Sequence, residues 1–441
     1  MTTMTLQPEV ELWSAHFGAV REGSTGESPA VTALRDEAAT RFLAAGFPTT
    51  ADEEWKLTSV APIARGAWRL ADSGISSAMG AEVEKQRLVD EVASELVFIN
   101  GAFVPSLSSI DLPAGVRFRP LREALVSPEW EMEFLGKIAR TTDRPFSDLN
   151  TATMRDGASV DVAPGFRGSA IHLIFLTSAE DGIAVAPRVL LRAGRGSEIT
   201  LIESHAGSGP CFTNAVTEIL ADDGAVVDHY RIIREGSEGH HVGSIDVLQN
   251  RDSWFRSRLI GLGGKLVRTD IDATLDGPGA GCSLDGLYLL RGRDHFDAHT
   301  RIVHAKPHTQ SLELYKGILN DASRGVFNGI IVVRPDAQKI TSGQVNKNLL
   351  LSNEAIADSN PQLEIHADDV KCSHGSTIGQ LDETALFYLQ SRGIGLEQAR
   401  GLLTYAFASE VLERMGIESI RRRLTGTLLE ILPLPASMEE S

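Results

Sequence analysis

The sequence predicts a mainly β chain with a β-solenoid core between an N-terminal and a C-terminal helical domain. Two observations favour the solenoid over a β-sandwich, which also fits a series of short strands. The region from about residue 150 to about residue 370 shows no helical period of useful length. Many of its β-rich runs begin directly after glycine, as the corners of stacked coils require. We therefore divide the chain into residues 1–145, 146–372 and 373–441.

The predicted strands are runs of β-branched and aliphatic residues that start roughly 13 to 28 residues apart, without a strict repeat motif. They cover residues 196–203, 224–232, 241–249, 254–262, 282–290, 297–305, 310–319 and 326–333.

The N-terminal domain is predicted to be mostly helical. A Ser-Pro pair at 28–29 supplies an N-cap and a proline at the first helical position, and the apolar residues at helical spacing that follow end before Gly46. A second Ser-Pro pair, at 127–128, predicts another helix start. Residues 96–104 predict two short strands around an Asn-Gly turn at 100–101.

The C-terminal domain is predicted to contain three helices. Asp382 can cap the first helix and Gly393 can end it. Two apolar stripes mark the second and third helices, formed by Leu396, Ala399, Leu403, Phe407 and Val411, and by Ile417, Ile420, Leu424 and Leu428. Because these helices follow the β core, we expect them to dock a partner protein.

The composition of the 441-residue chain narrows the functional classes. Its formal net charge of −17 argues against binding to a nucleic-acid backbone. No basic and apolar leader opens the sequence, and no uncharged apolar run approaches the roughly 18 residues of a membrane span. We therefore expect a cytoplasmic protein without a membrane segment. Cys211, Cys282 and Cys372 are odd in number and far apart, so reduced thiols are expected.

Common nucleotide, metal and hydrolase motifs are absent from the sequence. The phrase nearest to a GxxxxGK[ST] phosphate-binding loop is at residues 261–265, but its spacing is wrong and Leu266 follows it. The sequence also has no GxGxxG that opens a helix, no CxxC, no HExxH and no GxSxG. We therefore expect this chain to bind no nucleotide itself.

One candidate metal site lies on a predicted strand. His295, Asp297 and His299 alternate along it, which would place two imidazoles and a carboxylate on one face. An exposed, hydrated strand face is the simpler interpretation. We expect no site at two further pairs of histidines in the region. His240 and His241 lie in a predicted surface turn, and His304 and His308 are at even-numbered positions, which would face the opposite side of the strand from His295, Asp297 and His299.

Cys372 and His374 form a second candidate. In an extended segment alternate side chains point to the same side about 7 Å apart, so both could bind one metal or sulfur species. Lys371 and His374 would lower the pKa of the thiol and favour the thiolate. Because two ligands do not complete a tetrahedral site, the others would come most economically from another subunit. A cysteine that acts only as a small hydrophobe is the alternative.

Longer stretches of the sequence resemble the SufB/SufD family, whose members are subunits of the SufBCD complex that assembles iron–sulfur clusters. The likeness is strongest over His299–Ser352 and Leu363–Ile394, and the second stretch contains KCSHG at 371–375. FSDLNTATMRDGA at 146–158 is similar to the family's entry into its central domain, and GFPTTADEEWKLT at 46–58 is similar to its N-terminal signature. The resemblance therefore touches all three predicted domains.

The KCSHG motif resembles the SufD branch of the family. SufB-like chains have a phrase similar to IEHEAT where this chain has VKCSHGST at 370–377, and they carry further cysteines upstream, where this chain offers Cys211 and Cys282. A SufB identity is the alternative within the family, and it predicts sulfur acceptance by this chain alone.

The resemblance implies a right-handed parallel β-helix between two helical domains, which decides against the sandwich. It also implies that the chain pairs with SufB through the β-helices and docks SufC, an ABC-type ATPase, through its C-terminal helices. The docking residues expected there are Leu386, Phe387, Leu389, Leu403 and Phe407. The sequence leaves open a homodimer of the isolated chain and a reduced flavin bound to the complex.

For the site, the resemblance implies that His374 faces SufB and helps a SufB cysteine to hold a transient iron–sulfur cluster. Cys372 matches the cysteine of the motif, whose role is less defined. Sulfur would arrive through SufB, and ATP-driven closure of two SufC subunits would expose buried ligands. The chain itself would be a non-catalytic scaffold.

Two other functional classes are kept as alternatives. In the first, the chain is a purely structural assembly subunit, and Cys372 and His374 only pack at an interface. In the second, it is a carbohydrate-active β-helix enzyme that uses Asp294, Asp297 and Arg301. The absent secretion signal, the aromatic content of 6% and the acidic charge argue against the enzyme.

Overall fold

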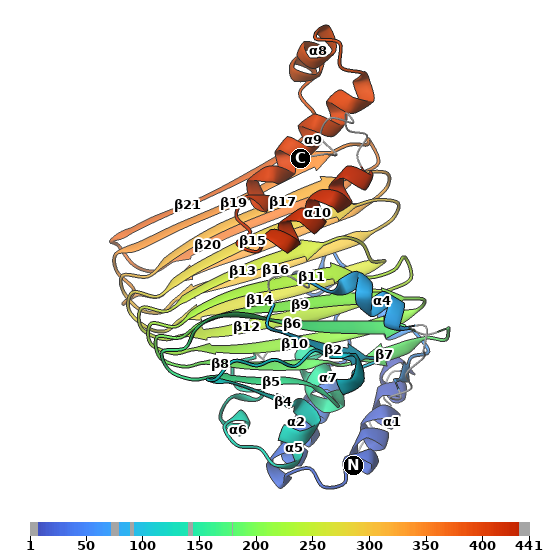
Figure 1. Cartoon of the computed structure of the whole chain (residues 1–441), viewed down its shortest axis with the longest axis vertical. Coiled ribbons are helices and arrows are strands. Elements are labelled where there is room, and N and C mark those ends of the chain that lie inside the picture. The colour runs from blue at the N-terminus through green and yellow to red at the C-terminus, as the bar shows by residue number, and fades with distance from the viewer. Residues whose placement is uncertain (1–7, 72–78, 89–91, 140–143, 179, 432–441) are drawn as a thin grey trace.

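The computed structural model describes residues 8–71, 79–88, 92–139, 144–178 and 180–431. Its centre is a two-sheet parallel β-solenoid, and helices lie at both ends of it (Figure 1). The helices are α1 (Pro8–Gly23), α2 (Pro29–Ala45), α3 (Ala61–Ala64), α4 (Met79–Gln86), α5 (Leu121–Val126), α6 (Glu131–Phe134), α7 (Pro145–Thr153), α8 (Glu383–Ser391), α9 (Leu396–Leu412) and α10 (Glu418–Ile431), with short 3-10 turns at Glu53–Trp55 and Pro105–Leu107.

Each coil of the solenoid contributes one strand to each of two sheets. In sheet A, neighbouring strands follow the order β4 (Val116–Pro120), β5 (Gly157–Val162), β8 (Arg188–Ala193), β10 (Cys211–Ala221), β12 (His240–Gln249), β14 (Leu266–Leu275), β16 (His295–His304), β18 (Arg324–Val333) and β20 (Ile356–Ile365). Two short strands extend this sheet, because β7 (Ile183–Val185) pairs with β10 and β1 (Arg69–Leu70) pairs with β7. Sheet B contains β2 (Ser94–Ile99), β3 (Ala102–Phe103), β6 (Arg167–Ser178), β9 (Glu198–Ser208), β11 (Val226–Arg234), β13 (Trp254–Gly261), β15 (Gly281–Leu290), β17 (Gln310–Leu319), β19 (Ile340–Leu350) and β21 (Val370–Gly379).

The strand pairing confirms the solenoid and decides against the sandwich. From β8 to β21, neighbours within a sheet are second neighbours along the chain and run parallel. In sheet B, for example, Val226 pairs with Trp254, which pairs with Gly281 one coil later. A sandwich built from hairpins would instead pair consecutive strands in antiparallel fashion.

The eight predicted runs all form strands, namely β9, β11, β12, β13, β15, β16, β17 and β18. The sequence interpretation missed other strands, and β10 and β19 show two different reasons. Every residue of β10 is buried, so this strand shows no alternation of polar and apolar residues. The inward face of β19 is polar, which reverses the expected pattern; the buried residues on it are Ser342, Gln344, Asn346 and Asn348.

Local signals in the N-terminal domain are mostly confirmed. The Ser28 hydroxyl accepts a backbone N–H at the start of α2. Asn100 and Gly101 have φ values of 49° and 79°, and they join β2 to β3 as an antiparallel hairpin. The second Ser-Pro prediction was wrong, because Ser127 follows the last turn of α5 and its carbonyl oxygen accepts a hydrogen bond from Arg119. The helix that comes next, α6, is a single turn.

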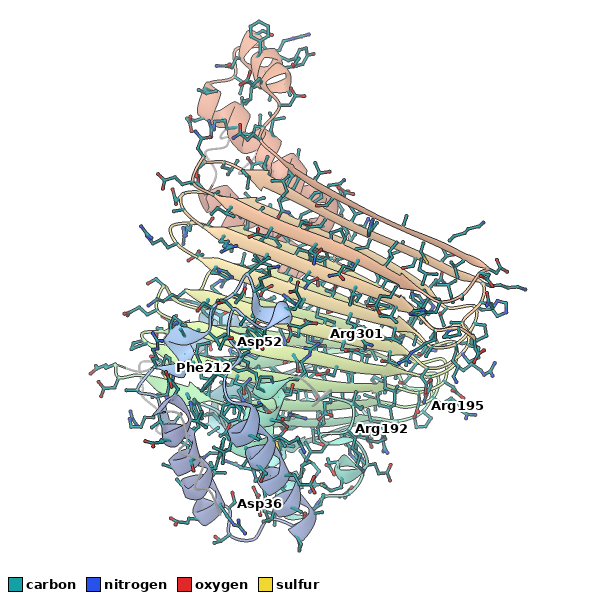
Figure 2. The ribbon with its side chains drawn as sticks, turned by 180° about the vertical axis from the view of Figure 1, so that it is seen from behind. Asp36, Asp52, Arg192, Arg195, Phe212 and Arg301 are labelled. Carbon is teal, nitrogen blue, oxygen red and sulfur yellow. The ribbon has the colours of Figure 1, made fainter. Side chains whose placement is uncertain are left out.

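The segment between α2 and α3 is fastened to sheet A by buried contacts, and Asp52 marks this segment in Figure 2. The guanidinium carbon of Arg268, in β14, lies 3.6 Å from the centre of the Trp55 ring. Asp297, in β16, accepts hydrogen bonds from Thr58 at 2.6 Å and from Arg268 at 3.1 Å. The N-terminal segment is therefore attached to strands more than two hundred residues away.

His299 completes this attachment by lying between two carboxylates. Its Nε2 is 3.0 Å from Asp297 and its Nδ1 is 3.3 Å from Glu54. Burial and Arg268 lower the pKa of His299, but the two carboxylates outweigh them and the pKa is raised above its ordinary value. The hydrogen bond with His299 lowers the pKa of Glu54 to about 2. These contacts favour a protonated imidazole in the folded protein.

The two ends of the solenoid are built differently. The antiparallel pairs β2–β3 and β4–β5 lie at the N-terminal end, and helices α1, α2, α5 and α6 lie at the same end, whereas α4 packs on sheet B (Figure 1). At the other end, β20 and β21 each pair with one strand in the described chain. Because β21 runs to Gly379, the predicted domain boundary between 372 and 373 falls inside this strand.

The C-terminal helices divide into a packed part and a free part. The predicted Asp382 cap forms, since its carboxylate accepts the N–H groups of Thr384 and Ala385. The second half of α9 and all of the described apolar face of α10 pack on the outer face of sheet B, through Ala408, Val411, Ile420, Leu424 and Leu428. Helix α8 stands beyond the last coil (Figure 1). The stripe of the third helix is therefore used within the chain and is not available to a partner.

The interior of the solenoid is filled by inward residues of both sheets. Tyr288 stacks on Phe296 with ring centroids 5.0 Å apart, and Tyr315 lies at the same distance from Phe327. Gly286 provides the space for the Tyr315 ring, because a Cβ at Gly286 would lie 2.2 Å from it. Close packing of this kind leaves no room for an added methyl group.

We expect the Gly286→Ala substitution to destabilise the solenoid by about 1–3 kcal/mol, because the methyl group would displace the Tyr315 ring. Thermal or urea unfolding would measure the loss. Gly343→Ala is the matched strand control, since the nearest atom to its added Cβ would be 3.6 Å away, an ordinary contact. Equal stabilities of the two variants would contradict this account of the interior.

The attachment at His299 predicts a pH-dependent stability. A raised pKa in the folded state means that the contribution is complete below the unfolded pKa of about 6.5 and disappears as the pH rises through the folded pKa. His299→Gln should therefore cost about 1.5–3 kcal/mol at pH 5.5, the range for hydrogen bonds to charged groups, and less at pH 9. Thr58→Val, which removes an uncharged donor to Asp297, should cost the same at both pH values. A pH-independent loss in His299→Gln would contradict the assignment.

Candidate functional site

Cys372 and His374 share the inward face of β21, as the alternation of side chains predicted. In the ladder, Cys372 pairs with Ser342 and His374 pairs with Gln344, and both partners on β19 are buried on the inward face. No further coil follows β21 in the described chain, so His374 is exposed and Cys372 is half-buried. The two candidate ligands therefore lie at the open mouth of the solenoid interior.

The surroundings of Cys372 correct one expectation from the sequence. Cys372 packs against a small apolar cluster that includes Ile331, Val333 and Ile340. This burial raises the pKa of the thiol, whereas the sequence predicted a lowered pKa. The reason is that Lys371 precedes Cys372 in an extended strand, so its ammonium group points to the opposite face. Metal binding to Cys372 would have to release the thiol proton.

The other two cysteines lie deep in the structure. Cys211 and Cys282 are both fully buried, and burial is the main reason that the pKa of each thiol is raised. A buried and protonated thiol is unreactive. Cys372 is therefore the cysteine with access to solvent.

Two lines of polar residues lead through the interior to the candidate site. Below Cys372, His304 Nε2 lies 3.0 Å from Ser311, whose hydroxyl lies 2.7 Å from that of Ser342. Below His374, Gln344 Nε2 donates to Glu313 at 2.6 Å. The sequence interpretation named His304 but expected no site there. It missed the other residues of these two lines, although the reversed polarity of β19 was a signal that could have revealed them.

Burial makes Glu313 unusual among these residues. It raises the pKa of the Glu313 carboxyl to about 7, so this group is partly protonated at neutral pH. Within the described residues, no group of three or more His, Cys, Asp or Glu side chains is arranged to hold a metal ion. Cys372 and His374 thus offer two donors that need further ligands from outside the chain.

The remaining histidine predictions have mixed outcomes. His295 and Asp297 both contact Thr58, so this strand face is covered by the N-terminal segment and is not a hydrated surface. His240 and His241 are buried in β12, and the prediction of a surface turn was wrong. Asp297 is also fully buried, so it cannot act on a polysaccharide from the solvent.

The predicted docking residues lie on α8 and α9 but differ in exposure. Phe387 is 72% exposed, and its neighbour Tyr388 is 56% exposed. Leu386, Leu389 and Leu403 are half-buried. The ring of Phe407 instead lies 4.5 Å from the ammonium group of Lys316 in β17, so Phe407 takes part in holding α9 on sheet B.

In the part of the chain that the structure describes, no helix has both the length and the apolar character to cross a membrane.

Comparison with known proteins agrees with this architecture. Residues 175–407 match the family described as "SUF system FeS cluster assembly, SufBD core domain", and residues 10–168 match the "SufBD protein N-terminal region". An iron–sulfur cluster assembly SufBD family protein of Synechocystis is 34% identical over 86% of this chain and 86% of its own length. The iron–sulfur cluster assembly protein SufD of Escherichia coli is 30% identical over 89% of this chain and 91% of its own length. With its solenoid core and these matches along most of its length, the chain belongs to the SufBD family of iron–sulfur cluster assembly proteins and is SufD-like.

Proposed function

We propose that this chain is a non-catalytic, SufD-type subunit that helps to hold a nascent iron–sulfur cluster at an interface with a SufB-type partner. His374 would be the main ligand of this chain, with Cys372 beside it, and the cluster is the cargo of the complex. The supporting observation is that both residues lie on the inward face of the last strand of an open solenoid. A site with two donors at an open end is suited to completion by another protein.

The unpaired edges at this end support the position of the SufB-type partner. Strands β20 and β21 present backbone N–H and C=O groups that no other strand of the described chain satisfies. Such edges favour the addition of strands from another chain. Ile365 and Ile378, which would contact a following coil, are 39% and 46% exposed. A partner solenoid placed here would cover both isoleucines and would bring its own ligands next to His374.

The proposal assigns the docking of a SufC-type ATPase to α8 and the first half of α9. The aromatic residues Phe387 and Tyr388 are free there, whereas α10 and the second half of α9 are packed on sheet B. Exposed aromatic side chains often dominate the binding energy of an interface. ATP hydrolysis would then take place on the partner, and its effect would reach His374 through movement of the assembled subunits.

We expect His374→Ala to reduce cluster formation by an order of magnitude or more, because it removes a ligand while leaving the strand intact. The measurement is anaerobic cluster reconstitution, followed by visible absorbance, on the chain co-expressed with SufB-type and SufC-type partners. His366→Ala, at another exposed histidine outside β21, is the control. An unchanged yield in His374→Ala, with normal assembly, would place the chemistry on the partner and leave this chain as a structural subunit.

We expect Phe387→Ala to weaken binding of the SufC-type subunit by about 2 kcal/mol, roughly thirty-fold in Kd, because a large exposed anchor is lost. Isothermal titration of the purified chain with the ATPase subunit would measure this. Ile110→Ala is a matched control, since Ile110 is 51% exposed in the N-terminal domain. Equal affinities for both variants would remove α8 from the docking surface.

A further inference from the structure

Gln344 lies beside His374 at the mouth of the solenoid. The two residues are direct partners in the parallel ladder between β19 and β21, and both face inward. Gln344 is 1% exposed, whereas His374 is exposed. Because adjacent strands are about 4.8 Å apart, the Gln344 amide is within reach of an imidazole on the next strand.

Glu313, one coil earlier in the solenoid, sets the orientation of the Gln344 amide. Its Nε2 donates to Glu313 on β17 at 2.6 Å. Its Oε1 is buried and has no hydrogen-bond partner within the described part of the chain. Since the nitrogen is directed toward β17, the oxygen is turned away from β17, and β21 is the strand on the other side of β19.

The absence of a side chain at Gly329 leaves space for the Gln344 amide in the interior. Gly329, on β18 across the interior, has no side chain where the Gln344 amide lies. A Cβ at Gly329 would be 2.2 Å from Gln344 Nε2 and 2.8 Å from the ring of Phe327. The position of the amide therefore depends on two features: its hydrogen bond to Glu313, and the space that Gly329 leaves on the facing strand β18.

We propose that Gln344 is a positioning residue whose side-chain oxygen accepts the ring N–H of His374, while Glu313 holds the amide in the required orientation. The inference rests on the proposed function, because it gives the candidate ligand of that site its hydrogen-bond partner. A neutral imidazole has one N–H and one lone pair. When Gln344 accepts the N–H, the other nitrogen keeps its lone pair for iron at the mouth of the solenoid.

Partners of this kind fix the tautomer of a ligand histidine. Their removal typically reduces metal affinity by 10- to 100-fold. Glutamine suits this role next to Glu313 because one amide both donates to the carboxyl and accepts from the imidazole. The tautomer of His374 is therefore a property of the chain itself and can be measured without a bound cluster.

The test is the ¹⁵N spectrum of the His374 ring in the full-length chain labelled at histidine. The chain has 12 histidines, so the His374 signals are assigned by their loss in His374→Ala. We expect one neutral tautomer in the wild type and an averaged mixture of both tautomers in Gln344→Leu. Gln344→Glu keeps an oxygen acceptor and should keep one tautomer. Gly329→Ala, which intrudes on the amide from the opposite sheet, should shift the spectrum toward that of Gln344→Leu.

A matched control separates this effect from general damage to the edge of the solenoid. Asn348→Leu also removes a buried inward amide from β19, but Asn348 pairs with the position of Ile378. It should leave the His374 signals unchanged. If the wild type shows both tautomers, or if Gln344→Leu keeps a single one, the positioning role is overturned.

The same variants distinguish this inference from the function on which it rests. In the assembled complex, Gln344→Leu should lower iron retention by 10- to 100-fold, in parallel with its effect on the tautomer. A changed tautomer in Gln344→Leu together with a normal cluster yield in His374→Ala would support the contact and refute the ligand role. Loss of the cluster in His374→Ala with an unchanged tautomer in Gln344→Leu would refute the contact and keep the ligand role.

Discussion

The parallel backbone ladder governs both the stability of this protein and the position of its unpaired strand edges. Each strand satisfies its N–H and C=O groups with the strand one coil before and the strand one coil after, so unpaired edges arise at the two ends. Antiparallel strand pairs and helices occupy the first end. The last end, formed by β20 and β21, has no such cover in the described chain. This end therefore exposes a row of backbone donors and acceptors.

The same ladder decides which side chains meet there. Parallel pairing preserves parity from coil to coil, so the inward positions of Ser342 and Gln344 require Cys372 and His374 to face inward too. The three cysteines differ in how far their coils lie from the open end of the solenoid. Cys211 and Cys282 lie on buried strands, while Cys372 is near the mouth. Identical thiols therefore differ in their access to solvent because of the coil in which they lie.

Polar side chains in the interior of the last coils lower the stability of the fold, and they lie next to the candidate ligand His374. The inward faces of β13 and β15 carry apolar and aromatic residues such as Phe255, Leu284 and Tyr288, whereas the coils before them hold a buried polar cluster around Glu203. Toward the open end, Glu313 and Gln344 replace them, and burial raises the pKa of Glu313 to about 7. Buried polar groups destabilise a protein unless they are hydrogen-bonded. Glu313 pairs with Gln344 and Gln344 pairs with His374, so these two buried polar groups lie directly beneath the candidate ligand.

Neighbouring residues were enough to predict the eight strands, the Ser28 and Asp382 caps, the Asn100–Gly101 hairpin and the shared face of Cys372 and His374. These features depend on dihedral preferences and on alternation within a few positions. The sequence could not show that Thr58 would cover Asp297, that the stripe of α10 would pack on sheet B, or that burial would raise the pKa of Cys372. Each of these outcomes depends on contacts between segments distant in the chain, and they arise only when the coils stack.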